Sequence, residues 1–249
     1  MIRVAVDAMG GDHAPQAEIE GVADALRARP DGLRVQLVGR PEAIEAELAR
    51  HPTIDRARIE VHPAPDVIGM AEKPLAAVRK KPHSSLVVGL RLQETGKSDA
   101  FLSAGNTGAV LAGSTLIFGL HEGVDRATVG TLFPTADGPV AVLDAGANVD
   151  CSPRELVNFA YLGTVYMRDL HRRPDPKVGL LNVGEEDEKG NALAKETHRL
   201  LKHASGLNYV GNIEGRDILG HPKHGRIDVI VCDGFVGNIV LKFYESAAR

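Results

Sequence analysis

The sequence contains no Trp, only four Tyr and six Phe, and two Cys in 249 residues. So few aromatic rings leave little surface on which nucleic-acid bases could stack. A net charge of −4 also lacks the basic field that a nucleic-acid-binding protein needs, so no nucleic-acid partner is expected. The cysteines, Cys151 and Cys232, are too few for a disulfide framework or a zinc cage, which favours a reduced, cytosolic protein.

Long hydrophobic runs are missing as well. The longest apolar stretch, Ala109 to Leu120, is well short of the roughly 20 residues that a membrane-spanning helix needs. The chain opens with Met1-Ile-Arg-Val, which leads directly into an expected strand, so we expect no signal peptide. With 43% hydrophobic and 25% charged residues, the composition is that of an ordinary globular protein with a sizeable core.

Short apolar runs alternate along the chain with longer segments of helical pattern. The apolar runs predict strands at Ile2–Val6, Arg34–Val38, Arg58–Val61, Ala100–Leu102, Val129–Leu132, Val140–Leu143, Val178–Leu181, Asn208–Val210 and Asp228–Val231. Helices are predicted at Pro41–Arg50, Ser84–Thr95, Thr107–Leu120, Pro153–Leu170, Asn191–His203 and Gly237–Ala248. The alternation indicates a single α/β domain over residues 1–249, with helices on both faces of a mostly parallel sheet. The irregular loop Pro63–Pro74 suits a mobile cover or a dimer contact.

Polar, glycine-containing segments follow several of these expected strands. They are Asp7–Asp12, Ser103–Ala109, Asp144–Asp150, Asn182–Asn191 and Asp233–Asn238. Ligands of open α/β sheets bind beyond the carboxyl ends of the strands, so loops that converge there would form one site. Each loop taken alone could equally be an ordinary tight turn.

The segment Ser103–Ala109 indicates an anion site. Its glycines allow a close approach of the backbone, and a helix is expected to begin at Thr107 or Gly108. The free N–H groups and the positive dipole end of that helix attract anions. The helix is apolar on nearly all sides and is therefore expected to be central and buried. Its small residues would also suit close packing, and the two interpretations are compatible.

Three well-known phosphate and nucleophile motifs are absent. The segment Gly108–Thr115 nearly matches a P-loop, but Ser114 stands where the lysine should be, which excludes a Walker-type NTPase. No G-x-G-x-x-G follows the first expected strand, which argues against a simple dinucleotide site. The lack of a G-x-S-x-G segment argues against an α/β-hydrolase.

Single residues in these loops have more than one interpretation. Lys189 lies in the acidic loop Gly184–Gly190, which suits a solvated turn, a metal site or a rim that orients the lysine. Asn238 follows Gly237 at the expected start of a helix, as an N-cap or as a donor to a developing oxyanion. Cys151 lies near a helix N-terminus, which would lower its pKa. Because no His is adjacent in sequence, a nucleophilic role for Cys151 is not expected.

Seven segments match one known pattern in order. They are VDAMGGDHAP at 6–15, MAEKPLAAVRKKPHSS at 70–85, SAGNTGA at 103–109, LDAGANVDC at 143–151, GLLNVGEEDEKGN at 179–191, VGNIEGRD at 210–217 and VCDGFVGN at 231–238. Together they resemble the PlsX-type phosphate acyltransferases of bacterial phospholipid synthesis, over essentially the whole chain. One glycine-rich motif would be a weak signal, whereas seven in register are highly specific.

The resemblance implies a three-layer α/β/α Rossmann-like fold, related to the phosphotransacetylases and the isocitrate dehydrogenase group. It implies an enzyme that transfers a long-chain fatty acyl group from acyl carrier protein to inorganic phosphate, giving acyl phosphate for phospholipid synthesis. No cofactor or metal is expected. A cytoplasmic homodimer that contacts the inner membrane face peripherally is also implied. Family members continue through further helices, so we expect a C-terminally shortened form that lacks them.

Phosphate is already an oxyanion nucleophile at neutral pH, so this reaction needs no Ser–His pair. Backbone N–H groups and side-chain donors are expected to form a phosphate cradle at Gly10, Gly11, Asn106, Thr107 and Gly108. Lys189 and Asn238 are the expected catalytic residues, as donors to the tetrahedral oxyanion. The other substrate-binding candidates are Asp7, Asp12, Ser103, Gly105, Asn148, Asp233, Gly234 and Gly237. Because carboxylates repel phosphate, the strand-end aspartates should fix loop backbones or orient Lys189 and Asn148.

An acidic carrier protein needs a basic docking patch. The densest cationic run is Arg79–Lys81, and Arg172–Arg173 forms another, although each also suits a solvated helix end. Three other functions stay open. They are a phosphotransacetylase that uses acyl-CoA, a dehydrogenase of the isocitrate type, and a non-catalytic module that binds anions or a partner.

Overall fold

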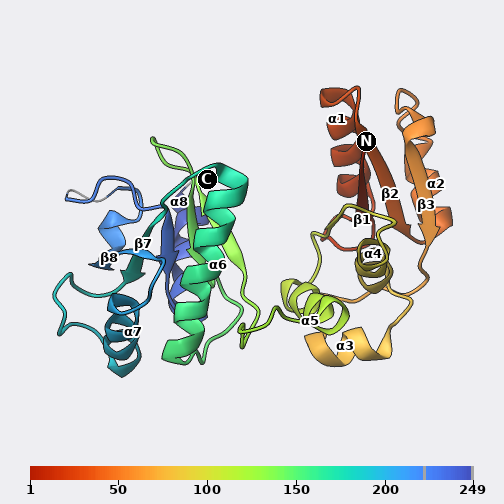
Figure 1. Ribbon diagram of the computed structural model, residues 1–249. Helices are drawn as coiled ribbons and strands as arrows, with labels where there is room; N and C mark the ends of the chain where they lie inside the picture. The colour runs from red at the N-terminus through yellow and green to blue at the C-terminus, as the bar shows by residue number, and fades with distance from the viewer. Residues whose placement is uncertain (221–222, 248–249) are drawn as a thin grey trace. The chain divides into compact units, whose positions relative to one another are not determined.

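The first half of the chain, Met1–Gly119, is built around four parallel strands in the order β3-β2-β1-β4 (Figure 1). The computed structural model describes residues 1–220 and 223–247. The strands of this first unit are β1 (Ile2–Asp7), β2 (Leu33–Gly39), β3 (Ile59–Pro63) and β4 (Ala100–Leu102). Its helices are α1 (Gln16–Ala28), α2 (Pro41–Leu48), α3 (Pro74–Lys80), α4 (Ser85–Glu94) and α5 (Thr107–Phe118), with a 3₁₀ turn at Arg56–Arg58.

The second half, Leu120–Arg249, contains a sheet of its own in the order β5-β6-β9-β7-β8. Among the described strands of this sheet, β5 is antiparallel to its neighbour β6, and the other pairs are parallel. The strands of this second unit are β5 (Gly130–Phe133), β6 (Val140–Leu143), β7 (Lys177–Leu181), β8 (Asn208–Ile213) and β9 (Val229–Val231). Its helices are α6 (Pro153–His171), α7 (Ala192–Lys202) and α8 (Gly234–Ala247), with a 3₁₀ turn at Gly215–Asp217.

The strands of the first sheet are buried on both faces. Val6 of β1 packs with Ile19 of α1 and Ile44 of α2, whereas its neighbour Ala5 packs on the opposite face with Leu92 of α4. Successive side chains of a strand point to opposite faces, so an uninterrupted apolar run requires helices on both sides. The first sheet is therefore the middle of three layers.

The second sheet is covered in the same way. Val229 of β9 packs with Phe159 of α6, and Ile230 of the same strand packs on the other face with Phe133. The ring of Tyr244 in α8 stacks on Phe133, with ring centroids 4.8 Å apart. The expectation of an α/β fold with mostly parallel, Rossmann-like sheets is thus confirmed.

The structure confirms each of the expected strands. The largest difference is in β8, which was expected to end at Val210 and ends at Ile213. Helices α1 and α3 come in addition to those expected. The strands form two sheets rather than one, because apolar runs show which segments are strands but not which neighbours they pair with. That residues 1–249 act as one catalytic domain stays a prediction.

Helix α8 begins at Gly234, whereas the sequence indicated a start at Gly237. The Oδ1 atom of Asp233 accepts a hydrogen bond from the N–H of Val236 at 3.0 Å, so Asp233 caps the helix. Asn238 lies in the second turn, and its interpretation as an N-cap is wrong. The expected helix end at Ala248 lies outside the described residues.

Helix α5 is less buried than its apolar sequence indicated. Gly113 lies against Leu90 of α4, because a Cβ at this glycine would be 2.7 Å from the Cδ1 atom of Leu90. Leu116 and Phe118 are exposed, so the expectation of a central and buried helix is wrong for this end of α5. Apolar composition shows that a helix can be buried, not how many of its faces find a partner. No helix within residues 1–220 and 223–247 is long and apolar enough to cross a membrane.

Two helix glycines should respond in opposite ways to an added methyl group. In Gly163→Ala the Cβ would lie 2.5 Å from Val229 Cγ1 and 2.7 Å from Leu143 Cδ2, which should lower the free energy of unfolding by about 1–3 kcal/mol. In Gly21→Ala, where the Cβ meets nothing within 4 Å, the gain in helix propensity should raise it by about 0.4–1 kcal/mol. Urea unfolding of the two variants measures both, and equal effects would contradict the packing of α6.

Candidate functional site

The loops after β1 and β4 are tied together by Asp7. Its carboxylate, 2% exposed, accepts from the hydroxyl of Ser103 at 2.8 Å and from the N–H of Met9 at 3.1 Å. The N–H of Gly105 in turn donates to the Ser103 hydroxyl at 3.1 Å. Asp7 therefore fixes loop backbone, as expected for a strand-end aspartate. Neighbouring parallel strands place their carboxyl ends side by side, which is why two loops so distant in sequence meet.

Glycines allow the backbones of these two loops to lie closer to each other and to neighbouring side chains than residues with a Cβ could. A Cβ at Gly10 would collide with the Asp7 carboxylate, and one at Gly11 would collide with Glu18. A Cβ at Gly105 would lie 3.2 Å from the Cα of Gly10, so the two loops touch backbone to backbone. Asp12 is exposed and has no hydrogen-bond partner among the described residues. Its role as a substrate-binding residue stays a prediction.

Asn106 is the N-cap of α5 and also fastens a second loop. Its Oδ1 accepts from the N–H of Ala109 at 3.0 Å. Its Nδ2 donates to the carbonyl oxygens of Gly69, Met70 and Glu72 at 3.3, 3.1 and 3.2 Å. The amide that was expected to donate to phosphate is therefore already engaged within the first unit.

The backbone N–H groups that begin α5 remain available. No acceptor among the described residues takes the N–H of Thr107 or Gly108. Gly108 also lies close to the start of α3, because a Cβ there would be 2.7 Å from Pro74 Cγ. Free N–H groups at the positive end of a helix dipole make an anion site. The α5 N-terminus thus retains the chemistry that the sequence indicated.

The irregular loop 63–74 is held in place within the first unit. The Nζ atom of Lys81 donates to Val67 O at 2.7 Å and to Glu72 Oε1 at 2.6 Å. The same Oε1 accepts from the N–H of Gly69 at 2.7 Å, and the bond from Lys81 is the main reason that the pKa of Glu72 is lowered. With Asn106 as a further donor, these bonds argue against a mobile cover. A dimer contact at this loop stays a prediction.

Asp144 organises the loop after β6 in the second unit. It is fully buried, and its φ of 71° lies in the left-handed region. Oδ1 accepts from the N–H groups of Gly146, Ala147 and Asn148 at 3.3, 2.7 and 3.2 Å. Oδ2 accepts from the side-chain amide of Asn148 at 2.9 Å, so Asp144 orients Asn148 as expected.

The first turn of α8 lies directly on this loop. A Cβ at Gly237 would collide with the carbonyl oxygen of Asp144, and one at Gly234 would be 2.7 Å from Asp144 Oδ1. Asn238 is exposed and lies over the same loop, because a Cβ at Gly146 would be 3.2 Å from its Oδ1. The glycines thus explain how an amide of α8 reaches the loop after β6.

Lys189 has a free ammonium group in the loop after β7. The side chain is exposed and makes no hydrogen bond or ion pair with any described residue. Two of the four acids in this loop are paired with other cations, Glu185 with Lys223 at 2.6 Å and Asp187 with Lys202, and none of the four is paired with Lys189. They therefore do not orient Lys189 directly. Residues 1–220 and 223–247 contain no cluster of three side chains suited to a metal ion.

A cavity of about 250 Å³ lies between this loop and the end of β9. Asn182 and Asn191 line it from the loop, and Asp233 and Val236 line it from the start of α8. Two of the expected strand-end loops therefore meet at one cavity within the second unit. The structure shows no hydrogen bond between the side chains of Lys189 and Asn238.

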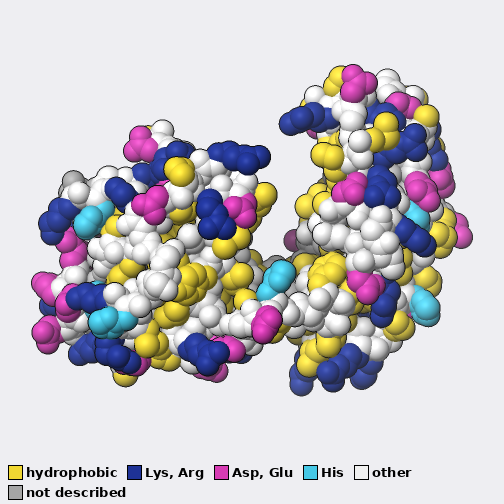
Figure 2. All heavy atoms as spheres, in the orientation of Figure 1, with side chains coloured by type: hydrophobic (Ala, Val, Ile, Leu, Met, Phe, Trp, Pro, Cys, Tyr) yellow, Lys and Arg dark blue, Asp and Glu magenta, His cyan; other side chains and the backbone are white. Residues whose placement is uncertain are grey.

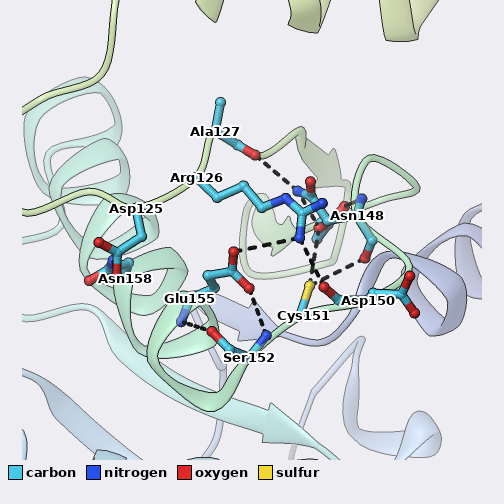
Figure 3. Close-up of polar contacts among 10 residues, drawn as sticks. Asp125, Arg126, Ala127, Asn148, Asp150, Cys151, Ser152, Glu155 and Asn158 are labelled. Carbon is cyan, nitrogen blue, oxygen red and sulfur yellow. Dashed lines mark hydrogen bonds and ion pairs between the residues drawn. The ribbon is translucent and has the colours of Figure 1, made fainter.

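Arg126 contacts the end of the loop after β6, although the sequence did not single it out (Figure 3). Its guanidinium donates to the carbonyl oxygen of Asp150 at 2.9 Å and lies 3.5 Å from Glu155 Oε1. Glu155 also completes the capping box of α6 with Ser152. A lone Arg in a segment without strand or helix pattern carries no signal that separates it from a solvated side chain.

Cys151 is a thiol donor rather than a thiolate. Its Sγ lies 3.2 Å from the carbonyl oxygen of Asn148. Burial, and then the charge of Asp144, raise the pKa of Cys151 to about 12. The expectation that the helix N-terminus lowers this pKa is wrong, because both of these effects oppose it.

Comparison with solved structures defines the class of fold. The chain is similar to the phosphotransacetylase EutD of Staphylococcus aureus, with a TM-score of 0.67 and 17% identity over 99% of this chain and 82% of that one. It is also similar to a branched-chain phosphotransacylase of Enterococcus faecalis V583, with a TM-score of 0.62 and 15% identity over 98% of this chain and 84% of that one.

Comparison of sequences identifies the family of this chain. A family model described as fatty acid synthesis protein matches residues 2–249. The phosphate acyltransferase of Desulforamulus reducens is 48% identical over 248 residues, which are 100% of this chain and 72% of that protein. That of Nostoc sp. strain PCC 7120 is 50% identical over 247 residues, 98% of this chain and 70% of that protein. The chain therefore belongs to the fatty acid synthesis protein family, which confirms the resemblance to the phosphate acyltransferases and favours an acyltransferase over a dehydrogenase or a non-catalytic module.

The raised pKa of Cys151 predicts a slow reaction with alkylating agents. At pH 8 a thiol with a pKa of about 12 is protonated, and its thiolate accumulates only as the pH nears that value. Iodoacetamide should therefore modify Cys151 roughly a thousandfold more slowly than a free cysteine, whose pKa is about 8.5. Mass spectrometry across a pH series measures the rate, and Cys151→Ser corrects for Cys232. Rapid labelling with a midpoint near pH 8.5 would contradict the contacts of Cys151.

Proposed function

We propose that this protein transfers a long-chain acyl group from acyl carrier protein to inorganic phosphate, giving acyl phosphate for phospholipid synthesis. The observation that carries the proposal is the anion site at the α5 N-terminus, where the N–H groups of Thr107 and Gly108 are free, in a chain of the phosphate acyltransferase family. Gly10, Gly11 and Gly105 keep the neighbouring loops free of side chains that would fill this site. The proposal includes a cytoplasmic homodimer with peripheral contact to the inner membrane face.

Phosphate acts as the nucleophile in the proposed reaction. One of its oxygens forms a bond to the thioester carbonyl carbon, and the carbonyl oxygen becomes a tetrahedral oxyanion. The Lys189 ammonium and the Asn238 amide donate to that oxyanion. The C–S bond then breaks, and the thiol of the carrier leaves as a thiolate. Since such a thiol has a pKa of about 8.5, the step needs no strong general acid.

Loss of either donor should slow acyl phosphate formation. Lys189→Ala and Asn238→Ala should each lower kcat by about 10²–10³, because one oxyanion donor contributes about 2.7–4 kcal/mol to transition-state stabilisation. The matched control is Lys195→Ala, which removes an exposed lysine of α7 near the same loop. Turnover is measured with acyl carrier protein and with acyl-CoA as donors. Near-wild-type turnover in both variants would exclude these roles, and a preference for acyl-CoA would favour a phosphotransacetylase.

The basic patch proposed for the carrier protein has fewer free cations than the sequence indicated. Lys81 is engaged by Val67 and Glu72, so Arg79 and Lys80 remain as the exposed cations at the end of α3. Figure 2 shows Lys and Arg side chains gathered at the part of the first unit where Figure 1 places α3. In the second cationic run, Arg173 is turned inward to Asp228 and Asp137.

Charge reversal of α3 should weaken binding of the acidic carrier protein. The double variant Arg79→Glu and Lys80→Glu should raise KM for acyl carrier protein by about tenfold at low salt, because complementary charge steers association. The effect should shrink at high ionic strength, and KM for phosphate should not change. Arg27→Glu, an exposed cation of α1, is the control. An unchanged KM for carrier protein would place the docking surface elsewhere.

A further inference from the structure

Lys189 is the last residue of a tight turn, 186–189, between β7 and α7. Its N–H donates to Glu186 O at 3.1 Å, and the side-chain amide of Asn212 in β8 donates to the same oxygen at 3.0 Å. The stem of Lys189 lies over Gly184, where a Cβ would be 2.9 Å from Lys189 Cγ. Because its ammonium group has no partner among the described residues, the turn and the contact of its stem with Gly184 are what position this side chain.

Asp187 is the second residue of this turn, and its side chain points to α7. Its Oδ1 lies 2.9 Å from Nε2 of His198, and its Oδ2 accepts from Lys202, one helical turn further along α7. The hydrogen bond from Lys202 and then the one from His198 lower the pKa of Asp187. An ionised carboxylate only accepts hydrogen bonds, so Nε2 of His198 carries the proton.

The His198 ring is fixed from its other side by the sheet. It is 4% exposed, and its Nδ1 lies 2.6 Å from the hydroxyl of Tyr209 in β8. Burial raises the pKa of Tyr209, so its hydroxyl stays protonated and donates to Nδ1. The two rings also meet edge to face, with centroids 5.6 Å apart. A neutral imidazole therefore satisfies both neighbours at once.

We propose that Tyr209, His198 and Asp187 form a brace that connects β8 to the turn and holds Lys189 in position for catalysis. An ion pair as exposed as that of Asp187 with Lys202 constrains little by itself. The hydrogen bond to the His198 ring, which is buried and also held by Tyr209, instead fixes the direction in which the Asp187 side chain points away from the turn. The three are positioning residues, and the catalytic part of the inference rests on the proposed function.

Amide hydrogen exchange tests the brace without reference to activity. Asp187→Ala and His198→Phe should speed exchange at the Lys189 N–H about tenfold, because a turn without its anchor opens more often. The matched control is Glu188→Ala, which removes a carboxylate of the same turn that has no partner among the described residues. Thermal unfolding checks that each variant is folded. Unchanged exchange in Asp187→Ala overturns the brace. If His198→Phe does not fold, Tyr209→Phe replaces it, and it should speed exchange at the same N–H.

Steady-state kinetics test whether the brace acts through Lys189. Asp187→Ala and His198→Phe should lower kcat about 10- to 100-fold, the scale of a misplaced catalytic group, with KM for the acyl donor within about twofold. Asp187→Asn keeps an oxygen that accepts from Nε2, and should restore kcat to within about twofold of wild type.

A double-mutant cycle separates the possible outcomes. In a Lys189→Ala background, Asp187→Ala should have no further effect on kcat, because the group that it positions is gone. An equal loss in both backgrounds overturns action through Lys189. If the wild-type protein forms no acyl phosphate, the proposed function fails, and hydrogen exchange alone then decides whether the brace exists.

Discussion

The carboxylate of Asp144, buried and surrounded by N–H groups, is the interaction on which the second unit depends. Residues other than glycine rarely adopt the left-handed region, and Asp144 does so with φ at 71°. Its bonds to three consecutive backbone N–H groups offset the strain and close the loop into a fixed shape. Helix α8 can then begin against its carbonyl oxygen only because Gly237 has no side chain.

Asp7 has a corresponding position in the first unit. It ends β1 as Asp144 follows β6, and it accepts hydrogen bonds from Met9 and Ser103. In both units hydrogen-bond donors of the loops surround the strand-end carboxylate: N–H groups of its own loop for Asp144, and donors of the loops after β1 and β4 for Asp7. An anion that approaches the neighbouring helix N-terminus therefore meets donors first. This arrangement reconciles an aspartate-rich set of loops with the proposed site for phosphate.

The sequence predicted the strands well, since each is a short apolar run that must be covered on both faces. It did not predict where α8 begins, because both Asp233 and Asn238 are residue types that cap helices. The hydrogen bond from Val236 to Asp233 and the contact of Gly237 with Asp144 show that the cap is Asp233. The sequence also placed Lys81 in a docking patch. Its partner Glu72 lies in an irregular loop, and no sequence pattern shows which residues such a loop brings together. The pKa of Cys151 was also mispredicted, because burial raises it more than the nearby helix N-terminus could lower it.

His198 shows the same limit for the candidate site. Both of its partners, Asp187 and Tyr209, are 11 positions away in the chain, one in a loop and one in a strand. A single histidine in an amphipathic helix has no pattern that reveals such partners. Residues that touch a ligand follow strand ends and can be found there, whereas residues that hold them in place are defined only by tertiary contacts.

Chemical ageing of the α5 cap would affect two parts of the first unit at once. One side-chain amide, that of Asn106, serves the helix through its oxygen and the segment 69–72 through its nitrogen. Deamidation to a carboxylate would replace the nitrogen by a second acceptor that faces three carbonyl oxygens. It would also add a negative charge at the helix end that attracts anions. Hydrolysis of this one amide would thus free the segment 69–72 and weaken anion binding at the α5 N-terminus in a single event.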